Sequence, residues 1–210
     1  KTFSLNGTAL ETQTRQLMDM DQWLRAYAVL TLCGVDDTYT FWLQHNMMFY
    51  FRPEDNKAVY FMWDSDFSFD RPATDVIVGD QNLGKIINLP SNLRVLYAQM
   101  LDIMETTYNT GYMSYWLAHY GPFSGTSYNR LTYIQQRTDY VNGVIAGAGG
   151  NTPFSVSATN LTVTGSNLVT LSGSAPVRVK TITINGVAWP VTWTSLTGWI
   201  LRMPANAATN

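Results

Sequence analysis

Two short aromatic runs separated by a polar turn constrain the fold of this chain most strongly. Residues 47–51 (Met-Met-Phe-Tyr-Phe) and 58–63 (Ala-Val-Tyr-Phe-Met-Trp) have the length and composition of strands. Residues 53–57 (Pro-Glu-Asp-Asn-Lys) are typical of a turn. The pattern therefore predicts a β-hairpin. Because both faces of each strand are apolar, we expect the hairpin to be buried within a larger body.

Two carboxylates, Asp64 and Asp66, directly follow the second strand. We expect them at the edge of a core, where a charge needs a partner. In an extended segment the two side chains point to the same side, because side chains alternate along a strand. Two oxygen ligands directed at one point suit a hard divalent cation. Capping of a turn and ion pairs with Arg52 or Arg71 are the alternatives.

A loop with two acids lies between a predicted helix and the hairpin. The helix covers residues 19–32 and starts with an Asp that can act as N-cap. Asp36 and Asp37 lie in the loop, and Asn46 begins the first strand. This order resembles that of the large lobe of protein kinases. There a loop Asp takes the proton of the substrate hydroxyl, while an Asn and a second Asp hold the metal ions.

Four segments make this resemblance more specific. They are residues 34–39 (Gly-Val-Asp-Asp-Thr-Tyr), 44–46 (Gln-His-Asn), 49–53 (Phe-Tyr-Phe-Arg-Pro) and 63–67 (Trp-Asp-Ser-Asp-Phe). In these segments the chain resembles the spore coat protein H (CotH) family of atypical, secreted protein kinases. The combination of an Asp-bearing loop, an Asn before an aromatic strand and a closing Trp-Asp-x-Asp motif is harder to meet by chance than any one part.

The resemblance implies a role for each polar residue in these segments. It makes Asp37 the catalytic-loop acid, with Asp36 as its rival. It makes Asn46 a magnesium ligand, Asp64 the main metal-binding carboxylate and Asp66 its supporting partner. Without the resemblance, a loop acid is usually solvated or caps a helix, and an Asn commonly stabilises a turn.

The resemblance also implies the reaction and the ligands. We expect transfer of a phosphoryl group from ATP to Ser or Thr of a protein, with Mg²⁺ as cofactor and Asn46 and Asp64 next to the nucleotide. His45 could be a ligand, although a packed or hydrogen-bonded histidine beside the site is favoured. Residues 69–90 occupy the position of the activation and substrate-docking loop. The segment before residue 19 is too short to form the small lobe, which carries a phosphate-holding Lys in such kinases. We therefore expect this chain to be a fragment that is inactive alone. The resemblance also implies a bacterial protein that lies at the cell surface or outside the cell.

The rest of the chain predicts an α+β protein in two parts. Helices are expected at residues 91–108, 110–120 and 127–144, which complete a mainly helical kinase-like lobe over residues 1–146. A flexible spacer at 146–151 follows, after which no Asp or Glu occurs. Residues 154–165, 168–173, 177–184 and 189–193 are strand-like, with Asn185-Gly186 as a hairpin turn. We therefore expect a small β-sandwich, or part of one, over residues 151–210.

Composition narrows the classes of function. The formal charge of -2, the pI near 5.6 and the scattered Lys and Arg residues argue against nucleic-acid binding. No apolar run is long enough to span a membrane. The single cysteine excludes an internal disulfide. Aromatic residues around Trp42, Phe49, Trp116 and Trp189 could stack on sugars, but core packing is favoured.

Two other functions are compatible with the sequence. The first is a non-catalytic adhesion or scaffold protein of the cell surface, whose β-sandwich binds a carbohydrate or a protein. The second is a hydrolase that uses Asp37 and Asp64 as a carboxylate pair.

Overall fold

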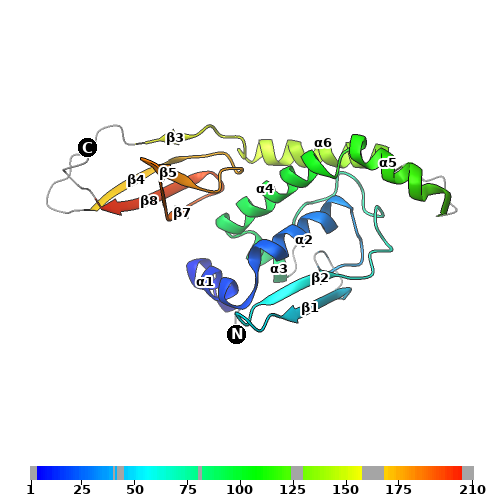
Figure 1. The fold of residues 1–210 in the computed structure, drawn as a ribbon, viewed down its shortest axis with the longest axis horizontal. Coiled ribbons are helices and arrows are strands. Elements are labelled where there is room, and N and C mark those ends of the chain that lie inside the picture. Colours follow the sequence, from blue (N-terminus) through cyan, green and yellow to red (C-terminus); the bar gives the residue numbers. More distant parts are fainter. Residues whose placement is uncertain are drawn as a thin grey trace.

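The computed structural model describes residues 4–39, 41, 45–79, 82–123, 130–157 and 168–204. Helices form most of the first part of the chain and strands form the last part (Figure 1). The elements are α1 (Gly7–Leu17), α2 (Met20–Leu32), β1 (Met47–Phe51), β2 (Ala58–Met62), α3 (Asn82–Ile87), α4 (Pro90–Thr106), α5 (Thr110–Tyr120), a 3₁₀ turn (Gly121–Phe123), α6 (Leu131–Gly147), β3 (Ser155–Val156), β4 (Leu168–Ser174), β5 (Ile182–Ile184), β6 (Val187–Trp189), β7 (Val191–Trp193) and β8 (Gly198–Pro204).

The main core lies where α2, α4 and α6 pack together. Asp19 caps α2 by accepting a hydrogen bond from the backbone N–H of Gln22. Leu24, Leu96, Met100 and other apolar side chains of these helices are fully buried. The α+β class and the helices predicted at 19–32, 91–108 and 110–120 are confirmed. In the part of the chain that the structure describes, no helix is both long and apolar enough to cross a membrane.

Two helical features differ from the sequence-based expectation. The helix predicted at 127–144 begins at Leu131 and extends to Gly147, and residues 124–129 lie outside the described ranges. Helix α1 was not predicted. Only Leu10 and Thr14 are buried among its eleven residues. A helix with so few buried positions gives a weak apolar period.

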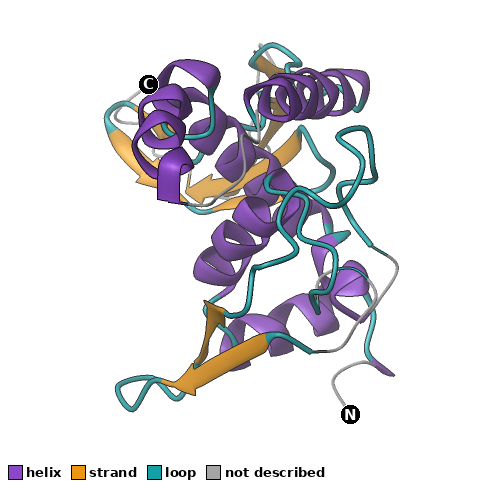
Figure 2. Ribbon diagram, turned by 90° about the vertical axis from the view of Figure 1, so that its right-hand side faces the viewer, coloured by secondary structure: helices purple, strands orange, loops and turns teal. Residues whose placement is uncertain are grey.

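The predicted hairpin forms, but it is not buried. β1 and β2 pair antiparallel, with Phe49 opposite Tyr60 and Phe51 opposite Ala58. β2 lies against α2, and β1 lies on the side of β2 away from that helix (Figures 1 and 2). Ala58 and Tyr60 are buried, whereas β1 and the end of β2 are largely exposed. The expectation of burial on both faces is therefore wrong, because a helix covers one side of the hairpin only.

The last part of the chain forms small antiparallel sheets. β3, β4, β8 and β7 make a four-stranded sheet in that order, and β5 pairs with β6. The Asn185-Gly186 turn between β5 and β6 is confirmed, with positive φ angles of 52° and 80°. β8 was not predicted, and residues 158–167 of the first expected strand lie outside the described ranges. The structure shows these sheets, while the β-sandwich stays a prediction.

The strands are attached to the helices by a buried arginine. Arg94 of α4 donates hydrogen bonds to the carbonyls of Ala175, Pro176, Val179 and Leu196. In the segment expected as a flexible spacer, residues 146 and 147 belong to α6 and a turn follows, in which the N–H of Gly150 bonds to Ile145 O at 2.8 Å. The division into parts at 146 and 151 remains a prediction.

Candidate functional site

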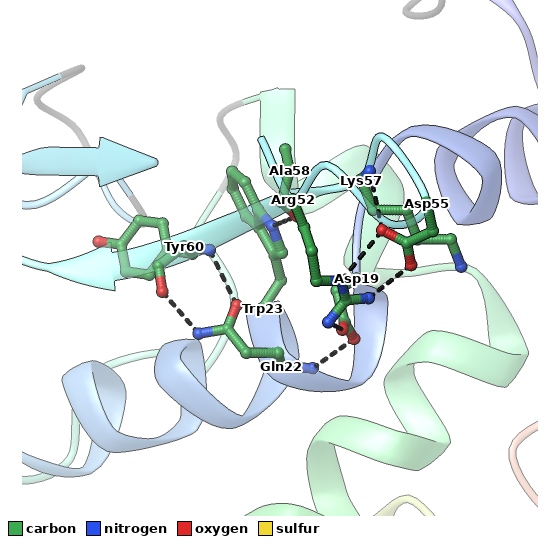
Figure 3. A network of polar contacts seen from close by, with 8 residues as sticks. All are labelled: Asp19, Gln22, Trp23, Arg52, Asp55, Lys57, Ala58 and Tyr60. Carbon is green, nitrogen blue, oxygen red and sulfur yellow. Dashed lines mark hydrogen bonds and ion pairs between the residues drawn. The ribbon is translucent and has the colours of Figure 1, made fainter. Parts of the chain in front are cut away.

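Helix α2 fixes the hairpin through the polar groups of one strand edge. The side chain of Gln22 both donates to Tyr60 O (2.5 Å) and accepts from Tyr60 N (2.8 Å), as a neighbouring strand would (Figure 3). Ala58 O accepts from the indole N–H of Trp23 (2.8 Å) and from the backbone N–H of Asp19 (3.0 Å). Three backbone groups on this edge of β2 are thus bonded to the start of α2, which fixes the strand against that helix.

Arg52, Asp19 and Asp55 form ion pairs at the turn end of the hairpin. Among the described residues, no ion pair is seen for Glu54 or Lys57. Arg52 pairs with Asp19 at 3.0 Å and with Asp55 at 2.6 Å (Figure 3). This pairing and the N–H of Lys57 lower the pKa of Asp55 to about 2. An ion pair with Arg52 was one alternative to metal binding for Asp64 and Asp66, but Arg52 pairs with Asp19 and Asp55.

Two polar loops meet at the open end of the hairpin. Backbone hydrogen bonds run from Phe69 N to Cys33 O (2.6 Å), from Arg71 N to Gly34 O (3.1 Å) and from Asp36 N to Phe67 O (3.3 Å). Gly34 has φ +57°, and an added Cβ would lie 2.0 Å from the hydroxyl of Tyr133. The loop that bears Asp36 and Asp37 is therefore held beside the loop that follows Asp64 and Asp66.

Asp37 and Asn46 are in direct contact. The side-chain amide of Asn46 donates to Asp37 Oδ2 (2.7 Å) and to the backbone carbonyl of Asp37 (3.0 Å). The other carboxylate oxygen, Oδ1, is buried and has no hydrogen-bond partner among the described residues. Asn46 has a positive φ of 54°, a conformation that Asn tolerates well. A buried carboxylate oxygen without a partner is costly, so it indicates a place for a ligand.

Asp36 has a different environment from its neighbour. Its Oδ1 lies 3.5 Å from Nη1 of Arg71, a guanidinium that is 7% exposed. Arg71 also pairs with Asp75 and lies 3.8 Å from the ring centroid of Phe41. Because Asp36 already has a cationic partner in Arg71, Asp37 is favoured over Asp36 as the acid that meets a substrate.

Asp64 and Asp66 lie at the exposed end of β2. Asp64 has φ +51°, so the chain leaves the strand at this residue, and a turn over residues 66–69 follows. The extended geometry and the position at a core edge expected for this pair are therefore wrong. Asp66 Oδ1 accepts from Phe67 N at 3.1 Å. Within the described ranges neither carboxylate has an ion-pair partner, because Arg52 and Arg71 pair with other acids.

A complete set of metal ligands is not assembled. Among the residues that the structure describes, no three side chains of His, Cys, Asp or Glu gather closely enough to hold an ion. The convergence of Asp37, Asn46, Asp64 and Asp66 on one ion therefore stays a prediction. The donor types nevertheless fit Mg²⁺, which prefers carboxylate and amide oxygens and keeps several waters. Asn46 Nδ2 is bonded to Asp37, which leaves the Asn46 amide oxygen for an ion, and the unpartnered Oδ1 of Asp37 marks a place for a ligand group beside it.

A comparison with protein families identifies the kind of protein to which these loops belong. A family model described as CotH kinase protein matches residues 3–140, more than half of the chain. The chain belongs to the CotH kinase family. The match includes α1, both polar loops and the hairpin, and it ends before the first β-strand of the last part. A search of curated proteins finds no match. Membership of the CotH family indicates a kinase-like function of the phosphotransferase class.

Several residues singled out in the sequence differ from expectation in their exposure. His45 is exposed directly before Asn46, so it is not packed, while the hydrogen-bonded form of the favoured prediction stays a prediction. Core packing was favoured for Phe49 and Trp116, yet both are exposed. Trp199, in the same aromatic region as Trp189, is buried as expected, and Trp42 lies outside the described residues.

Sequence reasoning missed one residue that shapes the loop after the site. Arg137 of α6 is 1% exposed and donates to the carbonyls of Thr31 (3.2 Å), Ala73 (3.1 Å) and Asp75 (2.5 Å). It thereby joins α2 to the start of the segment expected to bind substrate. The i, i+3, i+7 apolar period of α6, with Ile134 and Val141 buried, was the available signal, because Arg137 falls on that buried face.

Proposed function

We propose that this CotH-family chain carries the catalytic and metal-binding part of a protein kinase that transfers phosphoryl from ATP to Ser or Thr of a protein. The single observation that supports it is Asp37, which is oriented by Asn46 through one oxygen and presents a second, unpartnered one. We further propose, from the family resemblance, a location outside the bacterial cell or at its surface.

Asn46, Asp64 and Asp66 are the proposed ligands of the metal. Asn46 Nδ2 is occupied by Asp37, so its amide oxygen is the atom available for coordination. Asp64 and Asp66 present carboxylates that no arginine of the described residues neutralises. When bound, Mg²⁺ supplies positive charge to the nucleotide phosphates and offsets the charge that develops during transfer.

Asp37 is the proposed acceptor of the substrate proton. The hydroxyl oxygen of Ser or Thr attacks the γ-phosphorus, the bond to the bridging oxygen breaks, and ADP leaves. The hydroxyl proton passes to Asp37 Oδ1, the oxygen that has no other partner. Asn46 holds the second oxygen and so fixes the direction in which the carboxylate points.

Transfer of labelled phosphate from γ-labelled ATP tests this function directly. The assay should use the longest natural polypeptide that contains this chain, with Mg²⁺ and a general protein substrate. We expect Asp64→Asn to lower the rate about a hundredfold or more. Asp55→Asn is the matched control, since that carboxylate lies at the other end of the same hairpin and is paired with Arg52. Equal rates for the wild-type protein and Asp64→Asn would rule out the metal role.

A non-catalytic binding protein is the second candidate. Helix α5 has no buried residue, and its rings stack in the open, with Trp116 and Tyr120 centroids 5.9 Å apart at an interplanar angle of 12°. Such exposed rings are typical of binding surfaces. The two candidates differ in their response to nucleotide: a kinase is stabilised thermally by ATP at millimolar Mg²⁺, and a protein without a nucleotide site is not.

A further inference from the structure

The two edges of the hairpin differ in how their backbone groups are satisfied. The bond from Arg52 N to Lys57 O makes these residues a hydrogen-bonded pair, so the pairs Tyr50–Val59 and Met48–Phe61 are also hydrogen-bonded. Residues at the alternate positions direct their N–H and C=O groups away from the partner strand. On β2 these are Ala58, Tyr60 and Met62. Residues at the start of α2 take up Ala58 O and both outward groups of Tyr60.

The corresponding residues of β1 are Met47, Phe49 and Phe51. Within the described ranges, no helix, loop or side chain bonds to their outward N–H and C=O groups. β1 is therefore an open edge strand of five residues, and it contains no charged residue or proline within its length. Natural proteins commonly block such an edge with a charge, a proline or a covering segment. An unblocked edge offers a template for another strand.

The same three residues also line an apolar groove. The groove has a volume of about 370 Å³ and lies between α1, the start of α2, α3 and the hairpin. Leu17 and Trp23 form part of its wall, together with the side chains of Phe49 and Phe51. Among the residues that the structure describes, no charged side chain lines it. An occupant that matches both the groove and the edge has a backbone to pair with β1 and apolar side chains on one face.

We propose that β1 and this groove bind an extended segment of a partner protein, which adds to the hairpin as a third strand. Its backbone bonds to the outward groups of Met47, Phe49 and Phe51, and apolar side chains at alternate positions enter the groove. Strand addition explains why the edge and the groove occur together, because main-chain bonds give affinity and alternate pockets give specificity. This surface goes beyond the proposed phosphoryl transfer and does not depend on it.

A designed peptide tests the strand addition on the 210-residue chain. The probe is a seven-residue acetylated peptide in which leucine and threonine alternate between terminal lysines. Hydrogen exchange of individual amides is followed by NMR. In the free protein the amides of Met48 and Tyr50 are expected to be protected and those of Phe49 and Phe51 unprotected. Saturating peptide should slow exchange at Phe49 and Phe51 at least fivefold, and unchanged exchange there would overturn the proposal.

Two N-methylated versions of the peptide separate backbone pairing from simple apolar contact. One is methylated on its leucine nitrogens and the other on its threonine nitrogens. In a strand bound by one edge, only one set of N–H groups faces β1. We expect one version to bind about tenfold more weakly or worse and the other to bind as the parent does. Equal binding by the two versions would overturn strand addition.

A pair of variants with matched exposure locates the site on the chain. Phe49 is 51% exposed and lines the groove, whereas Tyr50 is 52% exposed on the other face of the same strand. We expect Phe49→Lys to weaken peptide binding about tenfold or more and Tyr50→Lys to have a smaller effect. Circular dichroism and the Tm of each variant confirm that both fold. The opposite ranking would overturn the proposal.

Sedimentation of the chain alone tests the other occupant, a second copy. Dimerisation that Phe49→Lys abolishes, together with protection of the Phe49 amide that rises with protein concentration, would assign the edge to self-pairing and overturn the partner proposal. A monomer at concentrations at which the peptide binds supports it.

Discussion

The two ends of the β1–β2 hairpin differ in how their charges are balanced. At the turn end, Arg52 forms ion pairs with Asp19 and Asp55. At the open end, Asp64 and Asp66 have no ion-pair partner among the described residues, and Asp37 has a buried oxygen without a hydrogen bond. Both ends belong to one small element anchored on α2, so the difference does not arise from a difference in fold.

This contrast separates acids that hold the structure from acids that are available for chemistry. A paired carboxylate stabilises the folded state, and removing its partner leaves the charge uncompensated. A buried carboxylate oxygen without a partner, such as Asp37 Oδ1, costs free energy, and a ligand offsets that cost. Asp64 and Asp66 are exposed, so their charges are solvated and remain available to an ion. Asp36 and Asp37 show the same contrast within two consecutive residues, because Arg71 pairs with the first and not with the second.

The largest expected effect is on activity at the open end. Asp37→Asn should lower phosphoryl transfer about a hundredfold or more, because an amide cannot accept the hydroxyl proton. Asp36→Asn should have the smaller effect, since its carboxylate already pairs with Arg71. The rates of both variants with γ-labelled ATP check this ranking. A greater loss in Asp36→Asn would reverse the assignment of the catalytic acid.

A second prediction concerns the backbone that joins the two loops. Gly34→Ala should lower the free energy of unfolding by about 2–4 kcal/mol, from a left-handed φ and from crowding against the hydroxyl of Tyr133. Gly7→Ala is the matched control, because Gly7 has a similar φ of +51° and open space around it. Its cost should be about 1–2 kcal/mol. Urea unfolding measures both, and equal costs would show that crowding contributes nothing.

A third prediction tests the anchored edge of β2. Gln22→Ala should destabilise the fold by about 1–3 kcal/mol, because it leaves both backbone groups of Tyr60 without a partner. Gln16→Ala, on the exposed face of α1, should change stability by less than about 0.5 kcal/mol. Thermal unfolding of the two variants provides the test. A neutral Gln22→Ala would mean that α2 does not anchor the strand.

The smallest expected effect is a pH dependence at the turn end. Arg52 lowers the pKa of Asp55 in the folded state to about 2, below its usual value of 3.8. The ion pair therefore contributes stability above about pH 4, and this contribution is lost as the pH falls through 2. The difference in Tm between wild type and Asp55→Asn should be constant above pH 4 and shrink below it. A difference that grows in acid would contradict the pairing.

The sequence predicts those features that depend on neighbouring residues. The N-cap of α2, the bounds of α5 and the turn at Asn185-Gly186 follow from local chemistry and are confirmed. The sequence does not predict which side of the hairpin α2 covers, because β1 is apolar on both faces. It does not separate Asp36 from Asp37 either, since Arg71 lies more than thirty residues further along the chain.

The sequence also does not predict how the strands of the last part are attached to the helices. A Gly-rich stretch is usually flexible, but here an added Cβ at Gly150 would lie 2.6 Å from Ile145, so the glycine allows a close turn. Contacts between distant residues, such as Arg94 with the carbonyl of Leu196, decide how the strands attach to the helices.

Mn²⁺ titration followed by NMR tests the central claim most directly, with the paramagnetic ion in place of Mg²⁺. We predict saturable broadening of the Asn46 side-chain amide and of the Asp64 and Asp66 backbone amides, with those of Asp55 unaffected. The broadening should disappear in Asp64→Asn and persist in Asp55→Asn. Equal broadening at both ends of the hairpin, or none at Asn46, would contradict the account.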